Sequence, residues 1–127
     1  MSMATPMIER YRDVEGRWRW RLLAADGHPL ADGVMAFDDE DALFDHLDRL
    51  RRLVPTATIC ETRPSGADHS CFVTQPGTGD EWRWHLIVTG DHVADSGEGY
   101  ADRSGAEASA EHTADAIASA DVRTWGA

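Results

Sequence analysis

The sequence contains no lysine, and all 12 of its strongly basic residues are arginines. They are outnumbered by 23 acidic residues, 15 of which are aspartates, so the net charge is −11. A lysine-free, aspartate-rich composition is typical of proteins adapted to molar salt, where a Debye length of about 3 Å screens the repulsion between surface carboxylates. We therefore expect a salt-adapted protein. Its negative field repels phosphate, which disfavours nucleic acid as a partner.

Cysteine is scarce, and long apolar runs are missing. Cys60 and Cys71 do not belong to a set with metal-binding spacing. No segment approaches the roughly 18 consecutive apolar residues of a membrane span. Residues 1–9 have neither the basic start nor the apolar run of a signal peptide. We expect a cytoplasmic protein with reduced thiols, no membrane contact and no bound cofactor.

One short motif of alternating aromatic and charged residues occurs twice, as WRWRL at 18–22 and as WRWHL at 82–86. Alternation with period 2 is typical of a strand that buries one face and exposes the other. Large aromatic side chains usually pack in a core, although a ligand platform remains an alternative. The residues that we expect to form the structural core are Trp18, Trp20, Trp82, Trp84, Phe37 and Tyr100.

The similarity between the two segments continues beyond the motif. The offset is 64 residues at the tryptophans and 63 residues after the following turn, where Ala57 and Ile59 match Ala120 and Val122. An internal period of this length indicates a duplicated unit. Half the chain would be marginal as a domain, so we expect one fused core, and hence a monomeric pseudo-dimer.

Each unit is predicted to contain three strands, a helix and a fourth strand. Helices are predicted from Asp38 or Asp39 to Leu53 and from Asp102 to Ser119, because aspartate caps both starts and apolar residues recur at helical spacing. The strands are predicted at 7–13, 17–24, 30–35, 56–62, 70–75, 81–89, 92–97 and 121–125. The boundaries are a flexible tail at 1–6, a first repeat at 7–62, a linker at 63–69 and a second repeat at 70–127.

The second unit resembles the YegP-like family, a domain of unknown function. The resemblance covers about Phe72 to Val122 and is carried by WRWHL at 82–86 and ADSGEGY at 94–100. The first unit keeps the tryptophans but has GVMA at 33–36 in place of SGEG. The predicted fold is α+β, with one largely antiparallel sheet and two helices on one face. The resemblance further implies that the C-terminal strands are swapped between repeats, so that 56–62 joins the second half and 121–125 the first. It transfers no catalytic residues.

Other groups of reactive residues have simpler structural explanations. The run at 96–99 (SGEG) lacks the spacing of a phosphate-binding loop, and its glycines fit a bulge or a close backbone approach. His28 and His92 lie at matched turns, where a metal or catalytic role is the less common case. Zinc binding by Cys60, His69 and Cys71 lacks a fourth ligand. The acidic run at 38–41 fits a helix start better than a cation site.

A row of cationic side chains lies opposite the tryptophans. It consists of Arg17, Arg19, Arg21, Arg83 and His85. One explanation is cross-strand pairing with acids such as Asp32 or Asp95. The other is a face that binds an anion or a protein. We expect a non-catalytic binding or interaction module whose partner is an unknown protein or a small anionic ligand. The alternative is an enzyme acting on a small anionic substrate, which a convergent pocket with shifted pKa values near Arg19 and Arg83 would favour.

Overall fold

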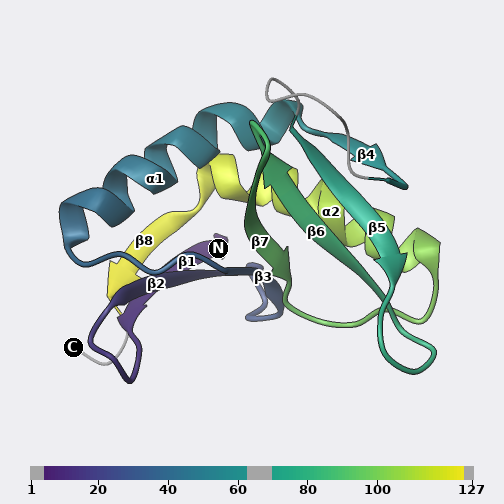
Figure 1. Cartoon of the computed structure of the whole chain (residues 1–127), viewed down its shortest axis with the longest axis horizontal. Coiled ribbons are helices and arrows are strands. Elements are labelled where there is room, and N and C mark those ends of the chain that lie inside the picture. Colours follow the sequence, from purple (N-terminus) through teal and green to yellow (C-terminus); the bar gives the residue numbers. More distant parts are fainter. Residues whose placement is uncertain (1–4, 63–69, 125–127) are drawn as a thin grey trace, which may run out of the picture.

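A computed structural model describes residues 5–62 and 70–124. Within them the chain forms eight strands, two α-helices and one short 3-10 helix (Figure 1). The strands are β1 (Met7–Arg12), β2 (Trp18–Leu23), β3 (Pro29–Gly33), β4 (Thr58–Cys60), β5 (Cys71–Pro76), β6 (Trp82–Val88), β7 (Asp91–Ser96) and β8 (Asp121–Thr124). The helices are α1 (Glu40–Leu53), the 3-10 helix η1 (Val54–Thr56) and α2 (Arg103–Ser119).

Every strand and α-helix predicted from the sequence is present, with each end within two residues of its expected place. The predicted linker at 63–69 lies outside the described residues, as do most of the predicted tail at 1–6 and the end of the last strand.

Both helices begin at an aspartate cap. Asp39, not Asp38, accepts a hydrogen bond from Ala42 N at 2.8 Å, and Asp102 accepts one from Gly105 N at 2.8 Å. These bonds satisfy backbone donors that have no partner within the first turn of a helix. Among the described residues, neither helix is long and apolar enough to cross a membrane.

All eight strands form one mixed sheet in the order β4-β5-β6-β7-β3-β2-β1-β8. Five neighbouring pairs are antiparallel, whereas β1–β8 and β4–β5 are parallel. The last strand therefore lies beside the first, at one edge, while β4 lies at the other edge beside β5 (Figure 1). Strands β3 and β7 meet at the centre, which joins the two halves of the chain in a continuous sheet.

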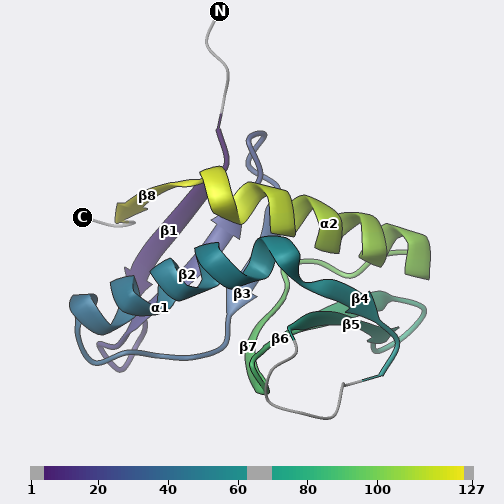
Figure 2. The ribbon, with the colours of Figure 1, turned by 90° about the horizontal axis from the view of Figure 1, so that it is seen from above.

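The core lies between one face of the sheet and the two helices, which run side by side (Figure 2). Trp18, Trp20 and Trp84 are buried there, as expected. Trp82, Phe37 and Tyr100 are only partly buried and pack at the margin of the core. For Trp82 the cause is its place at the start of β6, where the Arg103 guanidinium lies 4.8 Å from its ring centroid instead of a core side chain.

One histidine was not expected in this core. His46 on α1 is 9% exposed, and its ring centroid lies 6.5 Å from that of Trp20. Burial lowers the pKa of His46 to about 4, and the positive charge of Arg49 adds to this effect. Among the described residues, Trp20 Nε1 and His46 Nε2 have no hydrogen-bond partner. By contrast, Trp84 Nε1 donates to Ser109 Oγ at 3.1 Å.

Candidate functional site

The open face of the sheet is the side away from α1 and α2. The strand registers align one residue from each strand in a single row across this face, which we call the central row. In spatial order it consists of Arg123, Glu9, Arg21, Asp32, Asp95, His85, Val73 and Cys60. Charges alternate in sign from β8 to β3, whereas beyond Asp95 the row continues with a histidine and two uncharged side chains. The two halves of the face therefore differ in chemistry.

Glu9 is the buried centre of the charged half. It is 1% exposed and accepts hydrogen bonds at 2.8 Å from Arg21 Nε on β2 and from Arg123 Nε on β8. Burial alone would raise the pKa of Glu9, but the hydrogen bonds and charges of Arg123 and Arg21 outweigh it and lower that pKa. The sequence analysis missed Glu9, because alternation along β1 does not reveal that both neighbouring strands present arginine at its register.

Each cationic residue predicted for the binding face has an acidic neighbour. Arg17 Nε lies 3.4 Å from Asp38 Oδ1, Arg19 Nε 2.8 Å from Asp13 Oδ2, Arg21 Nη2 2.8 Å from Glu9 Oε1, and Arg83 Nη2 3.3 Å from Glu81 Oε2, while His85 pairs with Asp95. The hydrogen bond from Arg19 is the main cause of the lowered pKa of Asp13.

The expected partners were therefore wrong for the arginines. Asp32 forms no printed contact with Arg21 although it lies at the adjacent register, because Arg21 extends to the other side and binds Glu9. Asp95 binds histidines instead. The face is an array of local ion pairs and not a bare cationic patch.

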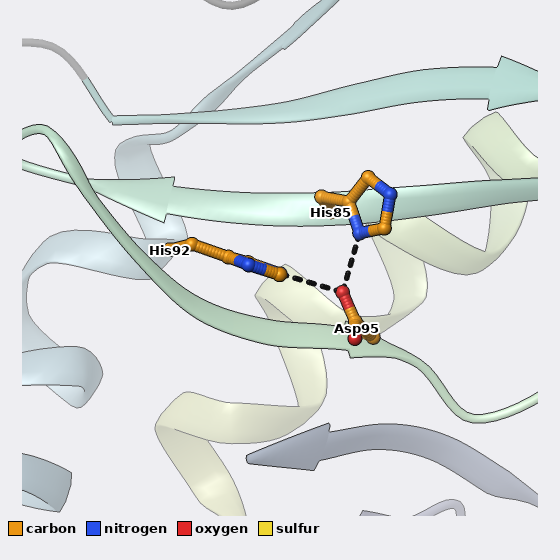
Figure 3. A group of neighbouring side chains, drawn as sticks. All are labelled: His85, His92 and Asp95. Carbon is orange, nitrogen blue, oxygen red and sulfur yellow. Dashed lines mark hydrogen bonds and ion pairs between the residues drawn. The ribbon is translucent and has the colours of Figure 1, made fainter. Parts of the chain in front are cut away.

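A second group gathers around Asp95. His85 Nδ1 on β6 and His92 Nε2 on β7 both contact Asp95 Oδ1, the latter at 2.6 Å (Figure 3). The two imidazole rings meet edge to face, with centroids 5.0 Å apart. Sequence reasoning had placed His85 in the arginine row and His92 in a turn, and it had not connected the two.

An irregularity in the β6–β7 register brings these side chains together. Leu86 pairs with Ala94, but Ile87 pairs with His92, so one extra residue of β7 is accommodated between them. Val93 and Ala94 are both buried. His92 and Asp95 consequently share the open face although they are three residues apart, a spacing that puts side chains on opposite faces of a regular strand.

Asp32 and Asp95 lie directly opposite each other at the central β3–β7 pair. Burial is the main cause of the raised pKa of Asp32, and the charge of Asp95 adds to it, while Arg21 and Arg83 act in the other direction. Among the described residues, Asp32 has no hydrogen bond or ion pair of its own. Two like charges at directly opposed positions destabilise a sheet unless a third group compensates them.

Cavities of different character lie on the two faces. On the open face, a cavity of about 240 Å³ adjoins the histidines and is lined by Val73, Gln75, His85, Ile87 and His92. On the helix face, one of about 540 Å³ lies between α2 and the β4–β5 edge, where Ala110 and Ala114 leave space beside Ile59. The small side chains of α2 explain the larger cavity, which lies away from the predicted cationic row.

The remaining predicted groups have structural roles where the structure describes them. A Cβ on Gly97 would lie 2.9 Å from the Pro29 backbone, and one on Gly99 would lie 2.3 Å from a Glu81 carboxylate oxygen. The expectation that these glycines permit close approach is confirmed. Cys60 and Cys71 are free thiols, and His69, the third member of the zinc set, lies outside the described residues.

Comparisons with known proteins place the fold. No family model matches the sequence, and no curated protein matches it. The solution NMR structure of yegP from E. coli, a protein of unknown function, is similar with a TM-score of 0.73 and 13% identity over 100% of this chain and 99% of that chain. That of a UPF0339 protein from Shewanella oneidensis has a TM-score of 0.70 and 8% identity over 94% of this chain and 91% of that chain. At such identities the likeness shows the fold alone: the chain shares the α+β fold of yegP and of this UPF0339 protein.

Proposed function

We propose that the chain is a non-catalytic binding module of the YegP-like family, and that the open face of its sheet is the working surface. The observation that carries this proposal is the even pairing of that face, where each of Arg17, Arg19, Arg21, Arg83 and His85 has a local acidic neighbour. Such pairing fits a surface that holds its side chains in place for docking. It does not fit a site that presents an unsatisfied charge to a reacting group.

The arginines differ in how readily a partner could engage them. The pairs Arg17–Asp38 and Arg83–Glu81 are long, at 3.4 and 3.3 Å, and their side chains are 41–86% exposed. Exposed pairs of this kind contribute under about 1 kcal/mol. A carboxylate or phosphate of a partner can therefore replace Asp38 or Glu81 at little cost and be held by the two-point geometry of guanidinium. The tighter Glu9 network fixes the middle of the surface.

The proposal includes a duplicated architecture with exchanged last strands. It is supported by the position of β8 beside β1 and of β4 beside β5. It is also supported by two equivalent bridges, Trp18 to Phe37 and Trp82 to Tyr100, which are 64 and 63 residues apart in their two members. If each half needs a strand of the other, a fragment of residues 70–127 forms no folded monomer. Sedimentation and amide NMR dispersion test this, and a folded monomeric fragment would contradict the exchange.

The alternative, an enzyme for a small anionic substrate, is favoured by one observation. The raised pKa of Asp32 provides a carboxyl group that holds a proton more readily than usual, on the face that also carries Arg21 and Arg83. A general acid needs such a group next to a bound substrate. Burial and the facing carboxylate of Asp95 account for the raised pKa without any substrate, so we place this alternative second.

The experiment uses the full chain as bait in a native extract at about 2 M KCl, where long-range attraction is screened and contact-range bonds remain. We expect the double substitution Arg17→Ser with Arg83→Ser to abolish retention of captured partners. The control is Asp45→Ser with Asp48→Ser on the exposed side of α1. If the control abolishes retention and the arginine variant does not, the helix face is the working surface. The further elements of the proposal are a cytoplasmic location, a salt-adapted origin and a monomeric state.

A further inference from the structure

We propose that His85, His92 and Asp95 form a binding site for a divalent transition-metal ion of the zinc class on the open face of the sheet. Their ligand atoms, two imidazole nitrogens and a carboxylate oxygen, all lie within 4.8 Å of one another. Imidazole and carboxylate are the ligands that Zn²⁺ and its first-row neighbours prefer, at about 2.0–2.2 Å from the ion. The inference does not depend on the proposed binding role of the arginines.

The directions of the side chains support the site. Both rings turn their nearer nitrogen toward one oxygen, Asp95 Oδ1 (Figure 3). Because the bulge in β7 brings His92 to the open face, the three ligands come from two adjacent strands of a rigid sheet and not from loops. Ligands on paired strands keep their separation, which lowers the entropy lost on binding an ion.

The surroundings of His85 complete the arrangement. Its other nitrogen, Nε2, contacts the side-chain amide of Gln75 on β5. The two ends of an amide are assigned from their contacts, and a half-turn places the oxygen of Gln75 where it accepts the Nε2 proton. A histidine that binds a metal through one nitrogen usually donates from the other to such an acceptor, which fixes the ring and its tautomer.

A separate observation points to a cation at this place. Asp32 faces Asp95 across the β3–β7 pair, and the two carboxylates have no arginine hydrogen-bonded between them. A dipositive ion bound by Asp95 would offset this repulsion. The adjoining cavity of about 240 Å³ leaves room for the water or anion that occupies the fourth position of a three-ligand site.

The experiment titrates the full, chelator-treated chain with Zn²⁺ in about 1 M KCl, which suppresses unspecific attraction to the acidic surface. Calorimetry should give one ion per chain. Two-dimensional NMR of the imidazole nitrogens should show changes at His85 and His92 and none at His28, whose partner is Glu98 at 3.2 Å. Cobalt(II) should give visible absorption bands from a site of low coordination number.

The variants separate this site from others. We expect His92→Gln and Asp95→Asn each to weaken Zn²⁺ binding by more than about tenfold, since loss of a direct ligand exceeds the effect of losing a supporting group. The matched control His28→Gln removes a histidine–carboxylate pair elsewhere and should leave the affinity unchanged. Loss of binding in Cys60→Ser but not in His92→Gln would overturn the proposal.

Two outcomes with the unmodified chain would also overturn it. One is equal affinity for Mg²⁺ and Zn²⁺, because Mg²⁺ has little affinity for imidazole and would report only the acidic surface. The other is unchanged imidazole signals of His85 and His92 at saturating Zn²⁺, which would leave these side chains as a hydrogen-bonded cluster. The NMR result does not require any variant to fold.

Discussion

Asp32 on β3 lies directly opposite Asp95 on β7, so that two carboxylates face each other at the centre of the sheet. On one side of this pair the central row continues with Arg21 and Glu9, and on the other it continues with His85. The charged half is satisfied by its own ion pairs. The pair of aspartates is the place where the electrostatics of this face remain unbalanced.

The first prediction concerns this repulsion. Asp32→Asn removes one of the two facing charges, and we expect the metal-free protein to gain about 0.5 kcal/mol in its free energy of unfolding, the scale of a cross-strand pair. Urea denaturation at pH 7 measures it. Asp80→Asn, at an exposed turn position, changes the net charge equally and should have no comparable effect. A destabilised Asp32→Asn variant would show that the carboxylate has a favourable partner.

The second prediction concerns Glu9. Glu9→Gln keeps the shape of the side chain but weakens its bonds to Arg21 and Arg123, and we expect a loss of about 1–3 kcal/mol at pH 7. Since the pKa of Glu9 is lowered by folding, its contribution is complete above the ordinary value of 4.5 and disappears as the pH falls through the native pKa.

The difference between wild type and Glu9→Gln should therefore shrink in acid. Urea denaturation from pH 7 to about pH 3 follows it, with Glu15→Gln at an exposed turn as the control. A difference that does not change with pH would mean that Glu9 contributes by packing and not as a carboxylate.

Glu9 and the histidine cluster also show where sequence reasoning ends. The WRWRL and WRWHL motifs predicted strands with a buried tryptophan face, and the aspartate caps predicted both helix starts. These features depend on local periodicity and capping, which a sequence displays directly. Which strands become neighbours at the sheet edges depends on long-range packing. That pairing places Arg123 beside Glu9, 114 residues away in the chain.

The register of the second hairpin could not be predicted for a related reason. Val88 pairs with Asp91, and continuing that register without interruption would place His85 opposite Ala94. The bulge shifts the partner by one residue, to Asp95, and brings His92 to the same face. Nothing in the alternation of β7 announces the bulge, so His85 and His92 were assigned to different features.

The third prediction concerns the buried imidazole of His46. Its pKa is about 4 in the native state, against 6.5 for an unperturbed histidine. Between these values the unfolded chain binds a proton that the native chain does not, so stability falls as the pH is lowered from 6.5 to 4. The loss from this residue amounts to about 3 kcal/mol.

His46→Gln removes this proton uptake and should flatten the stability curve over that interval. His112→Gln, at an exposed position of α2, should retain the wild-type slope. Chemical denaturation at closely spaced pH values compares the three proteins. Equal slopes for wild type and His46→Gln would mean that the imidazole is accessible to protons in the native state.

The last prediction concerns salt. A net charge of −11 on 127 residues, with no lysine, stores repulsion that molar salt screens within about 3 Å. We expect the melting temperature to rise strongly between about 0.1 and 2 M KCl, since the folded state concentrates the charges and gains most from screening. Asp45→Ser with Asp48→Ser removes two exposed charges and should raise the melting temperature at low salt while leaving a smaller gain at high salt. Because the Glu9 network is buried, its bonds should survive this range, so Glu9→Gln should show a salt dependence parallel to that of the wild type. A melting temperature that stays constant across the KCl series would refute the salt-adapted interpretation of the composition.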